Sequence, residues 1–170
     1  MLSILHRCAL IFLIAIPFLA AGCSESDATT PKPAATGVSL DYKLYKSPTC
    51  GCCEQWQTHM AEHNFVAGVY HPEDLNDVKA QLGIAPGYQS CHTAVFDNGY
   101  VFEGHIPARY IRQFLDNPPE GARGLAVPGM PLGSPGMEVD DRFMAYDILL
   151  LKDDGSAAFY ARIDTPDQQW

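Results

Sequence analysis

Three cysteines stand within four residues of one another, at Cys50, Cys52 and Cys53, and a fourth follows at Cys91. Cys50 and Cys53 are one helical turn apart, where an alternating strand pattern gives way to a helical one. Unpaired backbone N–H groups and the positive end of the helix dipole stabilise a thiolate at such a helix start. Two chemistries follow from this arrangement, which are dithiol–disulfide exchange and capture of a soft metal ion.

The number of thiols favours the metal. A disulfide exchanger needs only two thiols, so Cys52 and Cys91 would be surplus to it. Thiolates select copper(I), zinc or iron–sulfur clusters, and zinc sites more often show two separated Cys-x-x-Cys or Cys/His pairs. Inert structural disulfides are a third alternative, although cysteines this close in sequence meet disulfide geometry poorly. Metal binding is the leading interpretation, with thiol exchange and structural bridging as its alternatives.

Two histidine-bearing segments offer nitrogen ligands. Cys91 and His92 enter a predicted strand, whose successive residues face opposite sides, so only one of them is expected to face the cysteine turn. Cys91 is the better candidate, and His92 is equally well explained as a structural histidine. His105 ends the next predicted strand on the same rim, where it is a candidate ligand or hydrogen-bond partner of one.

Two methionines extend the candidate site. Pro128-Gly129-Met130 and Pro135-Gly136-Met137 form a short repeat, seven residues apart, in a segment rich in glycine and proline. Thioether ligands suit copper(I) and hardly suit zinc. The alternative is that both side chains plug the core beneath a long loop. Beside four thiols, Met130 and Met137 are counted as candidate copper ligands.

These residues need a scaffold that brings Cys91 to the cysteine turn. Periodicity predicts the order β-α-β-α-β-β-α, then a long loop and a terminal hairpin. The expected strands are 40–47, 65–70, 93–96, 100–103, 146–152 and 156–163; the expected helices are 52–64, 72–82 and 106–115; the loop is 117–138. This order predicts an α/β fold with a thioredoxin-like core, in which the third strand starts beside the reactive turn.

The first predicted helix carries two histidines of its own. Cys53, Trp56 and Met60 share one stripe of this helix, which is expected to be buried. His59 and His63 stand four residues apart, a spacing that can bind metal. Because His59 lies off the buried stripe, both are expected on a solvated face.

The first 22 residues have the features of an export signal. Arg7 precedes a short apolar stretch at 10–19, and small residues lead to Cys23. The pattern resembles a bacterial lipoprotein signal, in which cleavage leaves Cys23 to carry lipid; ordinary cleavage nearby, with Cys23 incidental, is the alternative. Residues 23–38 are expected to be the lipidated cysteine and a disordered tether, and 39–170 the metal-binding domain. Ser24 is not the Asp that often marks inner-membrane retention, so the outer membrane is weakly favoured.

Composition limits the class of partner. The chain of 170 residues has 11 basic and 20 acidic side chains and a formal net charge of -9. Nucleic-acid binding needs a basic footprint, which this composition does not supply. The length suits a single domain once the signal is removed.

The candidate residues lie in five motifs that follow one another along the chain. The motifs are Tyr45-Lys46-Ser47-Pro48-Thr49-Cys50-Gly51-Cys52-Cys53, Ser90-Cys91-His92-Thr93-Ala94, Glu103-Gly104-His105-Ile106-Pro107-Ala108, Gly124-Leu125-Ala126-Val127-Pro128-Gly129-Met130-Pro131 and Gly133-Ser134-Pro135-Gly136-Met137-Glu138. In this order they resemble the CopG-type family of periplasmic copper-resistance proteins. The resemblance implies a thioredoxin-like fold, a role in copper resistance and a multinuclear copper site at the cysteine turn. It also implies a proposed copper oxidoreductase activity.

Together these features predict an envelope copper(I)-binding protein, with copper redox cycling to Cu(II) as an extension of that role. The resemblance gives ligand roles to Cys50, Cys52, Cys53 and Cys91, and less strongly to His105, Met130 and Met137. The expected partners are copper ions, the membrane through lipid on Cys23, and copper efflux or redox proteins. A thiol–disulfide oxidoreductase acting on envelope proteins is the alternative function.

Overall fold

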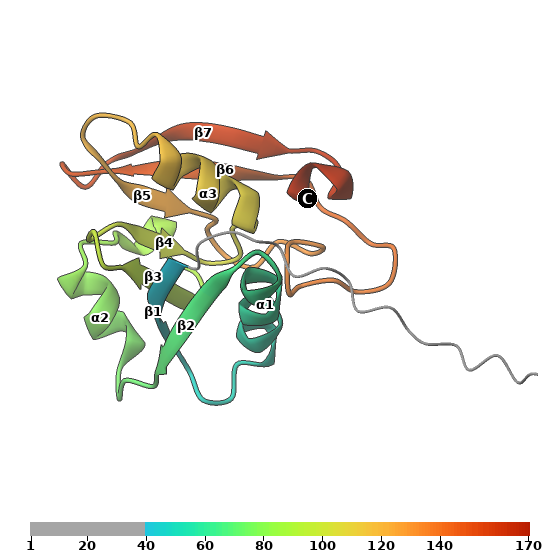
Figure 1. Ribbon diagram of the computed structural model, residues 1–170, viewed down its shortest axis with the longest axis horizontal. Helices are drawn as coiled ribbons and strands as arrows, with labels where there is room; N and C mark the ends of the chain where they lie inside the picture. Colours follow the sequence, from blue (N-terminus) through green and yellow to red (C-terminus); the bar gives the residue numbers. More distant parts are fainter. Residues whose placement is uncertain (1–39) are drawn as a thin grey trace, which may run out of the picture. The chain divides into compact units, whose positions relative to one another are not determined.

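The computed structural model describes residues 40–170, so the predicted signal 1–22, the lipidation site Cys23 and the tether 23–38 lie outside the described residues. Seven strands and three α-helices follow one another along the described chain (Figure 1). In order they are β1 (Leu40–Lys46), α1 (Gly51–Glu62), β2 (Phe65–Tyr70), α2 (Leu75–Gln81), η1 (Pro86–Tyr88), β3 (His92–Phe96), β4 (Val101–Glu103), α3 (Ala108–Asp116), β5 (Ala122–Ala126), β6 (Tyr146–Lys152), β7 (Ala157–Ile163) and η2 (Pro166–Gln169). None of the helices between residues 40 and 170 has the length and apolar character needed to cross a membrane.

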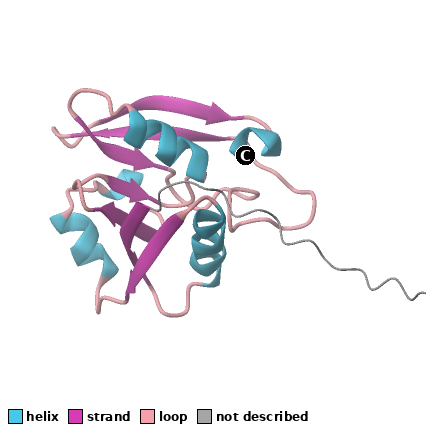
Figure 2. Cartoon of the chain, in the orientation of Figure 1, coloured by secondary structure: helices cyan, strands magenta, loops and turns pink. Residues whose placement is uncertain are grey.

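All seven strands form one mixed sheet, in the order β2-β1-β3-β4-β5-β6-β7. Figure 2 draws the strands in magenta and the helices in cyan. The pairs β1–β2 and β4–β5 are parallel, and the other four pairs are antiparallel. The expected α/β class is therefore confirmed at the level of a mixed sheet with a few helices. The β3–β4 and β6–β7 pairs are the two hairpins that the sequence predicts.

Helices cover both faces of the β1–β4 half of the sheet. Tyr42 and Leu44 of β1 are buried with Trp56 of α1 in the main core, as strand alternation predicts. Lys79 of α2 lies on the opposite face, where it contacts Thr93 of β3. The predicted stripe of α1 is confirmed, because Cys53, Trp56 and Met60 are all fully buried.

Aromatic rings fill the core between the sheet and helices α1 and α3. Phe96, Phe102 and Phe114 pack edge to face in succession, with ring centroids 5.2 and 5.4 Å apart. Tyr42 stacks on Phe96 at 5.4 Å and meets Trp56 edge-on at 6.0 Å. Each such side chain contributes roughly 1.5–3 kcal/mol when it is removed from water. This core packs α1, with the cysteines at its N-terminus, against the sheet.

The largest differences from the sequence prediction are one strand that it missed and two helices that begin later than expected. The segment predicted as one long loop contains β5, which pairs with β4 in parallel at the centre of the sheet. Gly124 of β5 has a φ of +152°, and a Cβ there would lie 1.7 Å from the Val101 carbonyl oxygen. Helix α2 begins later than predicted, because Asp74 caps it by accepting a 2.7 Å bond from the Asn76 N–H. Helix α3 begins at Ala108, after Pro107 in extended conformation.

Candidate metal centre

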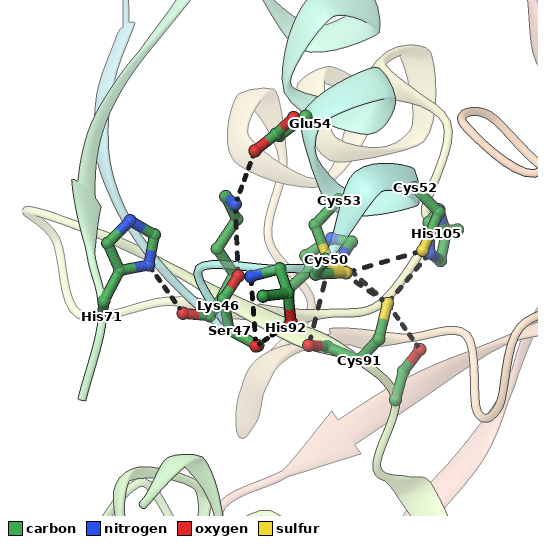
Figure 3. Close-up of a disulfide and its surroundings, with 12 residues drawn as sticks. Lys46, Ser47, Cys50, Cys52, Cys53, Glu54, His71, Cys91, His92 and His105 are labelled. Carbon is green, nitrogen blue, oxygen red and sulfur yellow. Dashed lines mark hydrogen bonds and ion pairs between the residues drawn. A yellow bond between two sulfur atoms is a disulfide. The ribbon is translucent and has the colours of Figure 1, made fainter. Parts of the chain in front are cut away.

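Four cysteine sulfurs gather where α1 begins (Figure 3). Cys50 and Cys53 form a disulfide, while Cys52 and Cys91 are free thiols. The Sγ atoms of Cys50 and Cys52 are 3.5 Å apart, as are those of Cys53 and Cys91. All four Sγ atoms lie within 4.8 Å of one another, so the expected approach of Cys91 to the cysteine turn is confirmed.

Strand register brings Cys91 to this place. Lys46, the last residue of β1, pairs with His92, the first residue of β3, in an antiparallel ladder. The residue before His92 therefore lies beside the turn that follows Lys46. Cys50 occupies the N-cap position of α1 with an extended backbone, and its N–H donates to the Ser47 carbonyl oxygen at 3.2 Å. A tight turn between Ser47 and Cys50 thus leads directly from the sheet into the thiol-bearing helix.

Two imidazoles meet the same sulfur. Cys91 Sγ lies 3.3 Å from Nδ1 of His92 and 3.0 Å from Nε2 of His105, and both rings are fully buried. His105 Nδ1 donates to the Pro135 carbonyl oxygen at 2.8 Å, which leaves the lone pair of Nε2 facing Cys91. Within residues 40–170 the Nε2 atom of His92 has no hydrogen-bond partner, and its ring lies 4.3 Å from Trp56. The position of His105 on the same rim as Cys91 agrees with the sequence prediction.

Cys91 joins the sulfurs of the cysteine turn and His92 does not, as predicted, but the His92 ring lies directly beside Cys91. Cys91 precedes β3, so the alternation of a regular strand does not apply between it and His92. Cys91, His92 and His105 form a second group of donors within 4.8 Å of one another. His92 is consequently a candidate ligand that the set predicted from the sequence did not include.

Burial keeps Cys91, His92 and His105 neutral. Burial, with a smaller contribution from the nearby Cys52, raises the pKa of the Cys91 thiol to about 12, and the Ser90 hydroxyl opposes the shift. Burial also lowers the pKa of His105, and lowers that of His92 well below its ordinary value. The imidazoles therefore carry free lone pairs, and a soft cation that binds Cys91 displaces a proton.

The loop after β5 reaches the site at Gly129, beside Met130. The Gly129 N–H donates to the Gln89 carbonyl oxygen at 3.1 Å, and its own carbonyl oxygen accepts from the Ser90 hydroxyl. Met130 itself is 53% exposed. The backbone thus holds Met130 next to the Ser90–Cys91 segment, while its role as a ligand stays a prediction.

The second methionine follows a close contact with α1. A Cβ at Gly136, whose φ is +85°, would lie 2.6 Å from the Cys52 carbonyl oxygen and 2.6 Å from the Trp56 nitrogen. Only glycine allows this approach. Met137 is half-buried beside it, and Pro135 is the residue that orients His105. The segment 135–137 therefore lies against the site, and the ligand role of Met137 also stays a prediction.

His59 and His63 do not offer a comparable metal site. His59 is only 5% exposed, because the C-terminal Trp170 ring packs 5.0 Å from it, so the expected solvated face was wrong for His59. Its Nε2 accepts a 3.0 Å bond from the Ala108 N–H, which places the ring proton on Nδ1. His63 donates from Nδ1 to the His59 carbonyl oxygen at 2.8 Å. Neither nitrogen of His59 is then free to bind a metal.

The donor set fits a soft metal ion. Hard cations such as calcium and magnesium take oxygen ligands, whereas this site offers thiols and neutral imidazoles. Four cysteines alone also suit tetrahedral zinc. The two donor groups share Cys91, and together they contain more donor residues than the four ligands that one tetrahedral ion requires. Fold and site together define a metal-binding α/β protein whose centre suits thiophilic ions.

Comparison with known proteins agrees with this class. The family model described as "Protein of unknown function, DUF411" matches residues 88–137, which contain Cys91, His105 and both loop methionines. No curated protein sequence matches the chain. Two solved structures are similar. The first, copper resistance protein CopG form 1, has 37% sequence identity and a TM-score of 0.69, and the match covers 75% of this chain and 99% of that chain. The second, CopG form 2, has 38% identity and a TM-score of 0.69, and the match covers 74% of this chain and 98% of that chain.

The chain belongs to the CopG-type family of copper-resistance proteins. The predicted family membership is thereby confirmed. The relatives and the cysteine cluster together support a copper-binding role.

Proposed function

We propose that the chain binds copper(I) in a multinuclear site and serves copper resistance and homeostasis in the cell envelope. The observation that carries this proposal is the position of Cys91, which belongs both to the group of four sulfurs and to the group with two imidazoles. A thiolate shared between two donor groups can bridge two metal ions. Copper(I) is the ion that accepts thiolate, imidazole and thioether ligands together.

The ligands of this site are the thiolates of Cys50, Cys52, Cys53 and Cys91 and the Nε2 atom of His105. Reduction of the Cys50–Cys53 disulfide is needed before all four sulfurs can bind copper. His92 adds a second imidazole through Nδ1. The thioethers of Met130 and Met137 complete the set from the loop.

The same dithiol can couple binding to copper redox chemistry. The thiolates of Cys50 and Cys53 each give one electron as the S–S bond forms, and two Cu(II) ions each accept one to become Cu(I). The close Cys50–Cys53 pair supports this step, because the disulfide forms without displacing either residue from the cluster. An envelope reductant of the thiol class returns the disulfide to the dithiol.

Thiol–disulfide exchange with envelope proteins is the second candidate function. The Cys50–Cys53 disulfide at the start of α1 favours it, since a helix N-terminus stabilises the leaving thiolate. We also assign a thioredoxin-like core to β1–α1–β2 and β3–β4–α3. Support comes from the strand order β2-β1-β3-β4, with parallel β1–β2 and antiparallel β1–β3 and β3–β4 pairs. Exchange alone gives no role to Cys52.

The proposed location is the periplasmic side of the envelope, with lipid on Cys23 and the outer membrane favoured. Copper efflux or redox proteins are the proposed partners. Metabolic labelling with a fatty acid should mark the wild-type chain and leave Cys23→Ala unlabelled. Equal labelling of both would refute the anchor without affecting the copper site.

The proposed function is tested by anaerobic titration of the reduced protein with Cu(I) in competition with a chromogenic Cu(I) chelator. We expect more than one copper per chain to be withheld from the chelator, and fewer in Cys91→Ser, which loses the shared donor. Zinc titrated in the same way is the control for general thiol affinity. If the chelator keeps all the copper, the cysteine turn is a dithiol exchanger and copper binding is not its function.

A further inference from the structure

A buried ion pair lies behind the metal centre, on the face of the sheet that α2 covers. Lys79 is 2% exposed and Glu103 is fully buried, and Lys79 Nζ donates to Glu103 Oε1. Taking two such charges out of water is unfavourable, and a well-packed apolar pair of similar volume is often as stable or more so. The pair therefore needs an explanation other than stability of the fold.

Among the described residues, the other hydrogen bonds of this pair go to Ser90 and Thr93, which flank the proposed ligands. Glu103 Oε1 accepts a 2.7 Å bond from the Ser90 N–H, and Oε2 accepts a 2.6 Å bond from the Thr93 hydroxyl. Lys79 Nζ also donates to that hydroxyl at 2.9 Å. Ser90 directly precedes Cys91, and Thr93 directly follows His92. The carboxylate thus holds the chain on both sides of the Cys91–His92 pair.

The sheet itself cannot supply the contact at Ser90. The β3 strand starts at His92, and the β3–β4 register begins with Thr93 opposite Glu103. The Ser90 N–H lies beyond this ladder and donates to the Glu103 carboxylate instead of to a strand carbonyl. Glu103 is also two residues before His105, and the Gly104 N–H donates to the His92 carbonyl oxygen at 3.0 Å. One side chain therefore ties the segment carrying Cys91 to the segment carrying His105.

We propose that Glu103 is a positioning residue of the copper site, which fixes Cys91 against His105 through its bond to the Ser90 N–H, with Lys79 balancing its charge. The inference rests on the proposed copper function for its role, but its geometry exists without metal. The relevant distance is the 3.0 Å between Cys91 Sγ and His105 Nε2. Loss of the anchor at Ser90 frees Cys91 to move away from His105.

Two double variants separate positioning from mere stability. In K79M/E103L the charges are replaced by apolar side chains, and Ser90 loses its acceptor. In K79M/E103Q the charges are also gone, but the introduced glutamine keeps an amide oxygen for the Ser90 N–H and an NH2 group for Thr93. Both variants share Lys79→Met and have similar volume. They differ in the hydrogen bonds under test.

Three quantities are measured on each protein: the thermal midpoint of unfolding, hydrogen exchange of the Ser90 amide in the reduced metal-free protein, and Cu(I) affinity by chelator competition. We expect K79M/E103L to keep a thermal midpoint near that of the wild type, to exchange the Ser90 amide faster, and to lose copper affinity by about 10- to 100-fold. K79M/E103Q should restore slow exchange and most of the affinity. Ile148→Val, in the core at β6, is the control that changes stability without changing copper affinity.

Each outcome decides the proposal. Equal copper affinity in K79M/E103L and wild type would overturn it, and so would equal losses in the Leu and Gln variants. If the wild type binds no copper, the proposed function fails, and positioning is then judged by Ser90 exchange and by the rate of Cys91 alkylation. Both rates should rise in K79M/E103L, and unchanged rates overturn the positioning role. If K79M/E103L does not fold, Thr93→Val is compared with Thr93→Ser, which keeps the hydroxyl bonded to Glu103. Weaker copper binding in Thr93→Val than in Thr93→Ser supports the positioning role, and equal binding overturns it.

Discussion

Protonation of His59 should weaken the fold. His59 Nε2 accepts the hydrogen bond of the Ala108 N–H at the start of α3, and a protonated ring cannot accept it. Burial, with a smaller effect of the neighbouring His63, lowers the pKa of His59 from its ordinary 6.5 to about 4. The groups facing it are His63 and Trp170, whose carbonyl oxygen accepts from Arg109.

The size and sign of the effect follow from these two pKa values. Between about 4 and 6.5 the unfolded chain holds a proton on His59 that the folded chain does not, so the free energy of unfolding rises with pH. The stabilisation is fully present above the unfolded pKa of 6.5 and is lost as the pH falls toward about 4. It amounts to roughly 3 kcal/mol, since one pKa unit corresponds to about 1.4 kcal/mol.

The assay is urea denaturation at several pH values across this interval, with the wild type compared with His59→Gln. Glutamine keeps an acceptor for the Ala108 N–H but does not titrate. His92 and His105, whose pKa values are also lowered, titrate in both proteins and cancel in the comparison. The wild type should lose about 3 kcal/mol more than the variant on acidification. An equal pH dependence in the two proteins would refute the buried, neutral state of His59.

Three substitutions test the site and its loop. Cys52→Ser should lower the number of copper ions bound per chain while insulin-reductase activity through Cys50 and Cys53 persists; unchanged copper stoichiometry with full activity would favour the exchanger. Gly136→Ala should lower the thermal midpoint and copper affinity more than Gly129→Ala. Both substitutions add about 1–2 kcal/mol of left-handed backbone strain, but only the Cβ at Gly136 would meet the backbone of α1, at 2.6 Å. Equal effects would mean that the loop does not pack closely against α1. Met137→Leu, which replaces the thioether by hydrocarbon of similar size, should weaken Cu(I) binding at unchanged stability, and unaltered affinity in a chelator competition would remove Met137 from the ligands.

Much of the site was predictable because sequence spacing and strand register act together. The thiols of the cysteine turn lie within one helical turn, and the antiparallel partner of β1 had to bring Cys91 to the same end. His105 could be placed by the same reasoning, since it follows β4. His92 could not, because the rule of alternation fails for a residue pair that straddles the start of a strand.

Other features depend on contacts that no local pattern reveals. Strand β5 looks like loop because Gly124 and its neighbours have little strand propensity, and the strand forms only where glycine lets it approach β4. His59 looks solvated because it lies off the apolar stripe, yet Trp170, which is far away in the sequence, covers it. The Lys79–Glu103 pair likewise joins α2 to β4 on one face of the sheet. Contacts of this kind, between segments far apart in the sequence, are found only from the three-dimensional structure.

X-ray absorption at the copper edge of the reduced, Cu(I)-loaded protein tests the central claim most directly. A multinuclear thiolate site predicts a first shell dominated by sulfur, together with scattering from a second copper ion close to the first. The copper–copper scattering should diminish in Cys91→Ser, which removes the sulfur shared by the two donor groups. A single copper with no copper neighbour, or a first shell of nitrogen and oxygen alone, would contradict the proposed site.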